Sequence, residues 1–252
     1  MGTSMTRTDS LNVKIFADGA DLDGIRKLAQ NPLIQGFTTN PTLMRKDGVS
    51  DYAAFAKDML GVIGGAPVSF EVFADEFNEM EAQALEIASW GDNVYVKIPI
   101  TNTRGDSSVP LVKRLSAQKV QVNVTAMMTL DQVRHVAEAL HAETPAVASV
   151  FAGRIADTGI DPVPLMREAV GILESRPKAE LLWASPRELL NIFHADEVGC
   201  HIITVTHDLL GKLSGVGKDL DRFSLETVKM FYDDAHAAGY TIATDKKAAA
   251  SG

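Results

Sequence analysis

One lysine lies inside an apolar, β-rich segment, where an isolated charge is costly. Lys97 occupies the run Val94-Tyr-Val-Lys-Ile-Pro99, and its ammonium must be paired there or have a lowered pKa. A neutral lysine amine is the nucleophile that forms a Schiff base with a carbonyl compound. The other interpretation is a structural ion pair with Glu71 or Asp18. The spacing alone leaves both interpretations open.

Two carboxylates are candidates for proton transfer beside this lysine. One of Asp18 and Glu71 could take a proton from a substrate hydroxyl, while the other could work through a water and Thr125. The alternative is that both carboxylates neutralise Lys97, which is less plausible for two carboxylates and one lysine.

A third group of residues suits an anion. Ser185-Pro186-Arg187-Glu188 has serine, proline and glutamate where a helix starting at Pro186 would place its N-cap, N1 and N3 residues. The amides at such a helix N-terminus attract anions, and Arg187 adds a planar fork suited to phosphate. Arg154 could converge on the same anion. For either arginine alone, a surface salt bridge is the alternative.

The elements that would position these residues alternate along the chain between short β-rich apolar runs and helix-period segments. The expected strands are 13–18, 36–40, 68–73, 94–100, 120–125, 146–153, 180–185 and 201–206. The expected helices are 21–30, 51–63, 76–90, 108–117, 130–141, 162–175, 186–195, 207–214 and 225–238. Eight such units in about 230 residues predict the α/β class, as a (β/α)8 TIM barrel with an additional C-terminal helix.

Alternation along barrel strands gathers the polar residues at one end. Barrel strands point alternate residues inward, which groups Lys14 with Asp18, and Trp183 with Ser185. The polar residues in the C-terminal halves of seven strands are Asp18, Asn40, Glu71, Lys97, Asn123, Thr125, Ser149 and Ser185. Barrel enzymes keep their active sites at that end. For Asn40 the alternative is a strand-to-helix turn at Thr39-Asn40-Pro41, with Asn40 as N-cap.

Composition limits the classes of function. The 252 residues include 24 Lys and Arg and 33 Asp and Glu, so the net charge is 24 − 33 = −9. This charge disfavours nonspecific binding to nucleic acid or anionic membranes, although a pocket can still be basic. Cys200 cannot form an intrachain disulfide. With no signal core and no long apolar run, we expect a cytoplasmic protein without a membrane or nucleic-acid partner.

We also expect one domain over residues 11–242, with flexible termini at 1–10 and 243–252. The six histidines have no metal-ligand spacing, so neither a metal nor a cofactor is expected. The last predicted helix carries an apolar face at Leu225, Val228 and Phe231. This face could cap the barrel or bind a neighbouring subunit, and we expect a homo-oligomer.

Seven segments carry the residues singled out above, and they occur in this order: Phe16-Ala-Asp18, Gly36-Phe-Thr-Thr-Asn40-Pro41, Ser69-Phe-Glu71-Val, Val96-Lys97-Ile-Pro99-Ile-Thr101, Asn123-Val-Thr125, Ser149-Val-Phe-Ala-Gly153-Arg154 and Ala184-Ser185-Pro-Arg187. In this order they resemble the transaldolase family, which includes the fructose-6-phosphate aldolases. They cover roughly Val13 to Leu213 and are much more specific together than any one alone. The resemblance implies that Lys97 is a catalytic lysine.

The resemblance implies a metal-free class I aldol mechanism on a phosphorylated sugar. Lys97 would attack the C2 carbonyl of a ketose phosphate, and Asp18 would take the C4 hydroxyl proton as the C3–C4 bond breaks. Glu71 and Thr125 would move protons through a water. The resemblance also implies substrate-binding roles: Asn40 and Asn123 for hydroxyls, and Ser149, Arg154, Ser185 and Arg187 for the phosphate.

Glu71 favours the transaldolase branch, because the aldolases typically carry glutamine there. Departures from the family pattern lie near the expected pocket mouth, at Gly19, Ala126-Met-Met128 and Thr204-Val-Thr206-His207. These departures affect which sugar and which acceptor are used more than they affect the reaction type. The protein could therefore act in a pathway other than the pentose phosphate pathway. The alternatives are an aldolase that releases dihydroxyacetone, and a noncatalytic sugar-phosphate-binding barrel.

Overall fold

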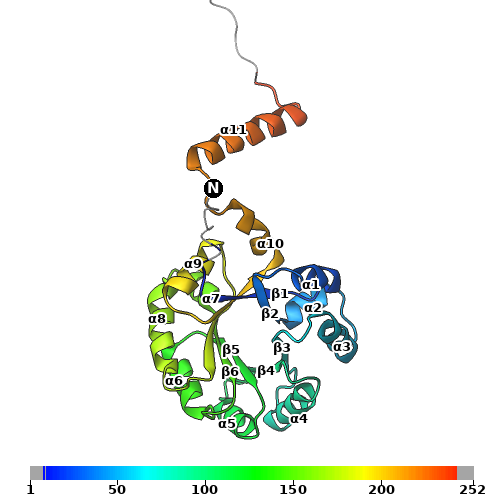
Figure 1. Ribbon diagram of the computed structural model, residues 1–252, viewed down its shortest axis with the longest axis vertical. Helices are drawn as coiled ribbons and strands as arrows, with labels where there is room; N and C mark the ends of the chain where they lie inside the picture. The colour runs from blue at the N-terminus through cyan, green and yellow to red at the C-terminus, as the bar shows by residue number, and fades with distance from the viewer. Residues whose placement is uncertain (1–7, 9, 243–252) are drawn as a thin grey trace, which may run out of the picture.

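Eight parallel strands form a closed barrel in which each strand pairs with the next and the last pairs with the first (Figure 1). The computed structural model describes residues 8 and 10–242. The strands are β1 Lys14–Asp18, β2 Ile34–Thr38, β3 Val68–Glu71, β4 Val94–Pro99, β5 Val122–Met127, β6 Ala146–Val150, β7 Ala179–Trp183 and β8 Ile202–Thr206. The predicted (β/α)8 barrel is confirmed. Of the termini expected to be flexible, 1–10 and 243–252, all residues except 8 and 10 lie outside the described residues.

Helices follow every strand. They are α1 Leu22–Leu28, α2 Pro41–Lys46, α3 Tyr52–Val62, α4 Phe77–Ala88, α5 Val109–Ala117, α6 Leu130–Ala139, α7 Ala152–Ala156, α8 Pro162–Leu173, α9 Leu190–Glu197, α10 His207–Leu210 and α11 Leu220–Ala237, with a 3₁₀ helix at Gly211–Gly215. The sequence did not predict the short helices α2 and α7. Residues 152–153, expected at the end of a strand, begin α7 instead.

The predicted start of the seventh barrel helix is wrong. Ser185 has a φ of +61°, whereas an N-cap residue needs an extended backbone. The side chain of Asn191 accepts hydrogen bonds from the amides of Arg187 and Glu188, at 2.8 and 3.1 Å. These bonds hold residues 186–189 in a loop, so α9 begins at Leu190. The amides of Arg187 and Glu188 are therefore engaged rather than free for an anion.

Other start signals are confirmed. Thr129 and Gln132 form a capping box at α6, and Asp161 caps α8. Asn40 caps α2 by accepting the Leu43 amide at 2.9 Å. The side chain of Asn40 still reaches the barrel mouth with its amide nitrogen, so its capping role does not remove it from the site.

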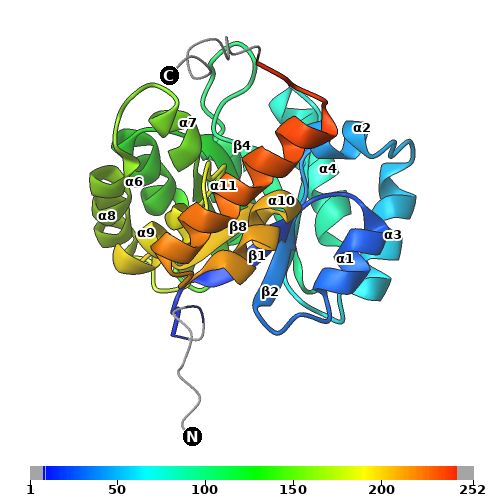
Figure 2. The same ribbon diagram turned by 90° about the horizontal axis from the view of Figure 1, so that it is seen from above.

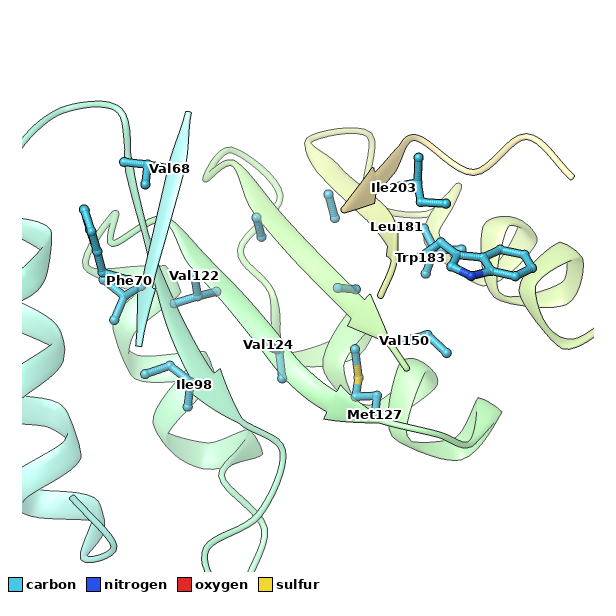
Figure 3. Close-up of a cluster of buried hydrophobic side chains, with 14 of the residues drawn as sticks. Val68, Phe70, Ile98, Val122, Val124, Met127, Val150, Leu181, Trp183 and Ile203 are labelled. Carbon is cyan, nitrogen blue, oxygen red and sulfur yellow. The ribbon is translucent and has the colours of Figure 1, made fainter. Parts of the chain in front are cut away.

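Two apolar layers fix the strands. The outer layer lies between strands and helices and includes Phe70, Ile98, Val124 and Trp183 (Figure 3). The inner layer fills the barrel below its mouth and contains Phe16, Val147, Leu182, Ala184 and Ile202. Such a filled interior confines the cavity and its polar groups to one end.

The alternation in β7 differs from the prediction. Trp183 belongs to the outer layer, and its ring centroid lies 6.4 Å from that of His194 in α9. Leu182 and Ala184 face inward instead. Ser185 still reaches the barrel mouth because it follows the strand in a left-handed conformation. It therefore does not share a face with Trp183.

Cys200 is a buried packing residue. It is 3% exposed, and its sulfur contacts the carbonyl oxygens of Leu181 and Ile202 at 3.3 Å each. Burial raises the pKa of the thiol to about 12. Cys200 is therefore a protonated, unreactive thiol at neutral pH.

Helix α11 extends away from the barrel in Figure 1, and in the view from above it runs across the front of the barrel (Figure 2). None of its residues is buried. Its exposed large apolar side chains are Leu220, Phe223, Leu225, Val228, Met230, Phe231 and Tyr232. Of the helices in residues 10–242, none has the length and apolar character needed to cross a bilayer.

Candidate active site

Lys97 lies at the centre of the polar end of the barrel. Its side chain comes from β4, between Glu71 on β3 and Asn123 on β5, with which it is in register. The residue is 7% exposed; its Nζ donates to the carbonyl oxygen of Thr39 at 2.8 Å and lies 3.2 Å from Glu71 Oε2. The structure therefore shows this ammonium paired, which is one of the two alternatives expected for a buried lysine.

Asp18 is held apart from that ion pair. Thr38 Oγ1 donates to its carboxylate at 2.8 Å, and Asn40 Nδ2 lies 3.3 Å from the other oxygen. Burial raises the pKa of Asp18, against the opposing effects of the Lys97 charge and these hydrogen bonds. Among the described residues, Asp18 has no ion-pair partner within 4 Å. Of the two carboxylates, Glu71 therefore pairs with the lysine, and Asp18, with its raised pKa, is available to accept a proton.

A chain of polar side chains crosses the floor of the site. Ser149 Oγ donates to Asn123 Oδ1 at 2.6 Å, and Asn123 Nδ2 donates to Ser69 Oγ at 2.9 Å. The buried hydroxyl of Thr125 has no hydrogen-bond partner in the described part of the chain. Because an unpaired buried hydroxyl is unfavourable, a substrate group or a water is its natural partner.

The second positive region lies after β6 and β7. Arg187 Nη1 donates to Ser185 Oγ at 3.1 Å, while its Nε donates to Asp157 Oδ1 at 2.8 Å and its Nη2 binds the other carboxylate oxygen. This hydrogen bonding by Arg187 lowers the pKa of Asp157, and the charge of Arg154 lowers it further. Arg187 thus makes a salt bridge and lines the cavity at the same time.

Gly153 couples the two arginine segments. A Cβ built at this position would lie 1.5 Å from the carbonyl oxygen of Ser185 and 3.5 Å from Arg187 Cγ. The amide of Gly153 also donates to the carbonyl oxygen of Ala184 at 3.3 Å. Because α7 carries Arg154, this contact sets the position of Arg154 relative to Ser185 and Arg187.

We expect Gly153→Ala to damage the arginine region selectively. The methyl group cannot fit against the Ser185 carbonyl, so the 184–187 segment must move and KM for a phosphorylated substrate should rise about tenfold or more. Steady-state kinetics measures this change. The control is Gly171→Ala in α8, where an added Cβ meets nothing within 4 Å. An unchanged KM in Gly153→Ala would contradict the expectation that Arg154, Ser185 and Arg187 bind the phosphate.

A cavity of about 540 Å³ joins these groups. All ten predicted residues line it: Asp18, Asn40, Glu71, Lys97, Asn123, Thr125, Ser149, Arg154, Ser185 and Arg187. Thr38, Phe151, Thr204 and Thr206 also line it and were not predicted as site residues. Thr204 Oγ1 lies 2.5 Å from Thr38 Oγ1. The sequence placed Thr204 and Thr206 near the expected pocket mouth, and their alternation on the last strand was the signal that could have identified both as site residues.

The two ends of the barrel differ in their buried titratable groups. A cavity of similar volume, about 560 Å³, opens at the opposite end, but its titratable groups include none that is buried. Among residues 8 and 10–242, no group of three or more His, Cys, Asp and Glu side chains is arranged to hold a metal ion.

Comparison with known proteins decides the family. The family model described as Transaldolase/Fructose-6-phosphate aldolase matches residues 15–249. The chain belongs to this family. A "Probable transaldolase" of Dehalococcoides mccartyi is 33% identical over 199 residues, covering 79% of this chain and 88% of that protein. A second transaldolase-family relative, the "Probable transaldolase" of Streptococcus agalactiae, is 33% identical over 224 residues, or 84% and 99% of the two chains.

A solved structure supports the fold alone. The crystal structure of KGPDC from Streptococcus mutans aligns with a TM-score of 0.53 and 8% identity. The alignment covers 79% of this transaldolase-family chain and 89% of the other chain. At that identity, the likeness extends to the barrel and not to its chemistry.

Proposed function

We propose that this protein is a transaldolase that transfers a dihydroxyacetone unit from a ketose phosphate to an aldose acceptor through a Schiff base on Lys97. The observation that carries the proposal is the buried Lys97 ammonium, 3.2 Å from the Glu71 carboxylate, with the Asp18 carboxylate held separately. A noncatalytic sugar-binding barrel needs neither a buried nucleophile nor two differently placed carboxylates.

The first half of the reaction joins the sugar to the enzyme. The Glu71 carboxylate takes a proton from the Lys97 ammonium, and the free amine attacks the C2 carbonyl of the ketose phosphate. Glu71 then returns a proton, through a water held by Thr125, to the carbinolamine hydroxyl. That hydroxyl leaves as water, which gives the protonated Schiff base.

The second half breaks and remakes a carbon–carbon bond. Asp18 takes the proton of the C4 hydroxyl, the C3–C4 electron pair flows into the Schiff base, and an aldose phosphate leaves. The remaining three-carbon enamine attacks the aldehyde carbon of an acceptor, and Asp18 returns its proton to the new alkoxide. The same steps in reverse release the product ketose, so no metal, cofactor or external oxidant is needed.

The remaining residues bind the sugar. Asn40 and Asn123 contact substrate hydroxyls, since each has amide hydrogen-bonding capacity left beyond its contacts in the fold. Ser149 lies on the same floor, at the phosphate side of the cavity. Arg154 and Arg187, with the Ser185 hydroxyl, bind the phosphate, for which their planar donor groups are suited.

One experiment separates the proposal from its alternatives. The protein is incubated with a ketose phosphate, with and without an aldose acceptor, and free dihydroxyacetone and aldose phosphate are measured; borohydride is then added and the modified residue is found by mass spectrometry. We expect an adduct at Lys97 and sustained aldose release only with acceptor. Sustained dihydroxyacetone release without acceptor would identify an aldolase. Binding without exchange or adduct would identify a sugar-binding barrel.

We further propose a homo-oligomer in which α11 packs on a second copy of the chain. The helix carries seven exposed large apolar residues and extends away from its own barrel, so a neighbouring barrel is within its reach (Figure 1). Reciprocal packing of this kind also closes a symmetric assembly. A molar mass of 27.1 kDa by light scattering, which is the mass of one chain, would contradict this assembly.

A further inference from the structure

Strand β3 extends beyond the part of β2 with which it pairs. The two strands are in register at Phe37 with Val68 and at Thr38 with Ser69. The chain then enters α2, which begins at Pro41. Alternate residues of a strand point their main-chain groups to the same neighbour, so Glu71, like Ser69, points its amide and carbonyl toward β2. Strand β2, however, ends at Thr38, so no residue of β2 pairs with Glu71.

The hydroxyl of Tyr52 takes the place of the missing strand. The amide of Glu71 donates to Tyr52 Oη at 2.7 Å, and Tyr52 Oη donates to the carbonyl oxygen of Glu71 at 3.0 Å. One side-chain oxygen thus satisfies both main-chain groups of the residue that pairs with Lys97. Buried main-chain groups are almost always paired, so this contact replaces two ladder bonds.

Tyr52 is itself rigidly held. It is the first residue of α3, whose N-cap Asp51 accepts the Ala54 amide at 3.0 Å. Its ring lies against Phe70, Phe73 and Trp90, with centroids 6.1, 4.6 and 5.6 Å away. Burial raises the pKa of the hydroxyl above its ordinary range, so it stays protonated and keeps its donor.

The other partner of Lys97 is fixed by the same strand pair. The hydroxyl of Thr39 donates to the carbonyl oxygen of Ser69 at 3.0 Å, and the carbonyl oxygen of Thr39 accepts from Lys97 Nζ. The ends of β2 and β3 therefore present two acceptors to one ammonium. The acceptor on β3 is the Glu71 carboxylate, and Tyr52 is the residue that holds the main chain of Glu71 in place.

We infer that Tyr52 is a positioning residue: its hydroxyl fixes the main chain of Glu71 and thereby the distance over which the Glu71 carboxylate exchanges protons with Lys97. The inference rests on the proposed Schiff-base function. Without the hydroxyl, the end of β3 has no partner on the β2 side, and the carboxylate is no longer held at its 3.2 Å separation from the amine. Small misplacements of this kind cost large factors in rate.

Tyr52→Phe tests the inference because it keeps the ring and removes the hydroxyl alone. We expect the single-turnover rate of borohydride trapping at Lys97 and kcat to fall together by about tenfold or more, while KM for the ketose phosphate changes by less than about twofold. Amide hydrogen exchange at Glu71 should become at least about tenfold faster, with the Val96 amide in β4 unaffected. A merely structural role would not shift trapping and the Glu71 amide together at constant KM.

Tyr95→Phe is the matched control. Tyr95 is a partly buried tyrosine of β4 packed against the inner apolar layer, and this variant should trap sugar at the wild-type rate. If the wild type traps sugar and Tyr52→Phe traps it equally fast, or if exchange at Glu71 is unchanged, the inference is wrong while the proposed function stands. If the wild type does not trap any ketose phosphate, both are wrong.

Discussion

Replacing Lys97 with methionine is expected to abolish Schiff-base formation and to lower turnover by a factor on the order of 10⁴ or more, the scale seen when a covalent nucleophile is removed. Methionine has a similar length but no amine, so the ketose phosphate can still enter the cavity without being bonded to the enzyme. Mass spectrometry after borohydride treatment, together with steady-state kinetics, measures the change. Sugar binding should persist, because the residues proposed to bind the phosphate are untouched.

The chain contains a matched control for this variant. Lys14 also lies on a barrel strand and forms an ion pair with a strand glutamate, Glu180, at 2.5 Å, but at the opposite end of the barrel. Lys14→Met should retain trapping and turnover. Wild-type turnover in Lys97→Met, or an adduct on another lysine, would overturn the proposed mechanism.

The second large effect is expected for Asp18→Asn, which should lower kcat by about 10² to 10⁴, as is typical for loss of a general base. Asparagine keeps the size of the side chain but cannot take the C4 hydroxyl proton. Because Lys97 and Glu71 are unchanged, borohydride should still trap the ketose phosphate at Lys97. The intact ketose adduct, rather than the three-carbon adduct, should then predominate.

The same substitution should stabilise the fold at neutral pH. Burial raises the pKa of Asp18 above its ordinary value of 3.8, so the folded state binds this proton more tightly than the unfolded state does. The carboxyl group therefore favours folding below that ordinary value and loses this contribution as pH rises through the raised pKa. At pH 7 the ionised group costs stability, and asparagine should recover about 0.5–2 kcal/mol.

Urea unfolding of the wild type and of Asp18→Asn, at pH 7 and near pH 4, checks the sign of this change in the free energy of unfolding. The stability gain of Asp18→Asn should be largest at pH 7 and should shrink toward acid, as Asp18 of the wild type takes up its proton. Asp58→Asn, at an exposed position of α3, should show neither the gain nor the kinetic defect. A variant less stable than the wild type at pH 7 would contradict the account of Asp18.

The features that the sequence predicted correctly rest on local periodicity. Alternation placed Asp18, Glu71, Lys97 and Asn123 on inward faces at one end of a barrel, because a strand's period of two holds wherever the strand is regular. The capping box at Thr129 was likewise readable because both of its partners lie within four residues. These patterns need no knowledge of distant segments.

Errors arise where distant segments meet. Ser185, with its left-handed conformation, lies against Gly153, a residue far earlier in the chain. The Asn191 side chain that delays the start of α9 lies only three to four residues from the amides it binds, so it is a local signal that the sequence reading missed. The contact of Tyr52 with Glu71 joins a helix to the end of a strand 19 residues later. No short-range period encodes such contacts, and the assignment of Trp183 to the wrong face of β7 came from carrying strand alternation through Ser185, beyond the end of the strand.

The burial of Cys200 makes the chain convenient for site-selective chemistry. It is the single thiol in the sequence, and with a pKa of about 12 it has almost no thiolate at neutral pH. A maleimide dye should therefore leave the native protein unlabelled. A cysteine placed at an exposed polar position of α11, such as Asp234, would then be modified alone, so fluorescence could report where that helix lies during turnover.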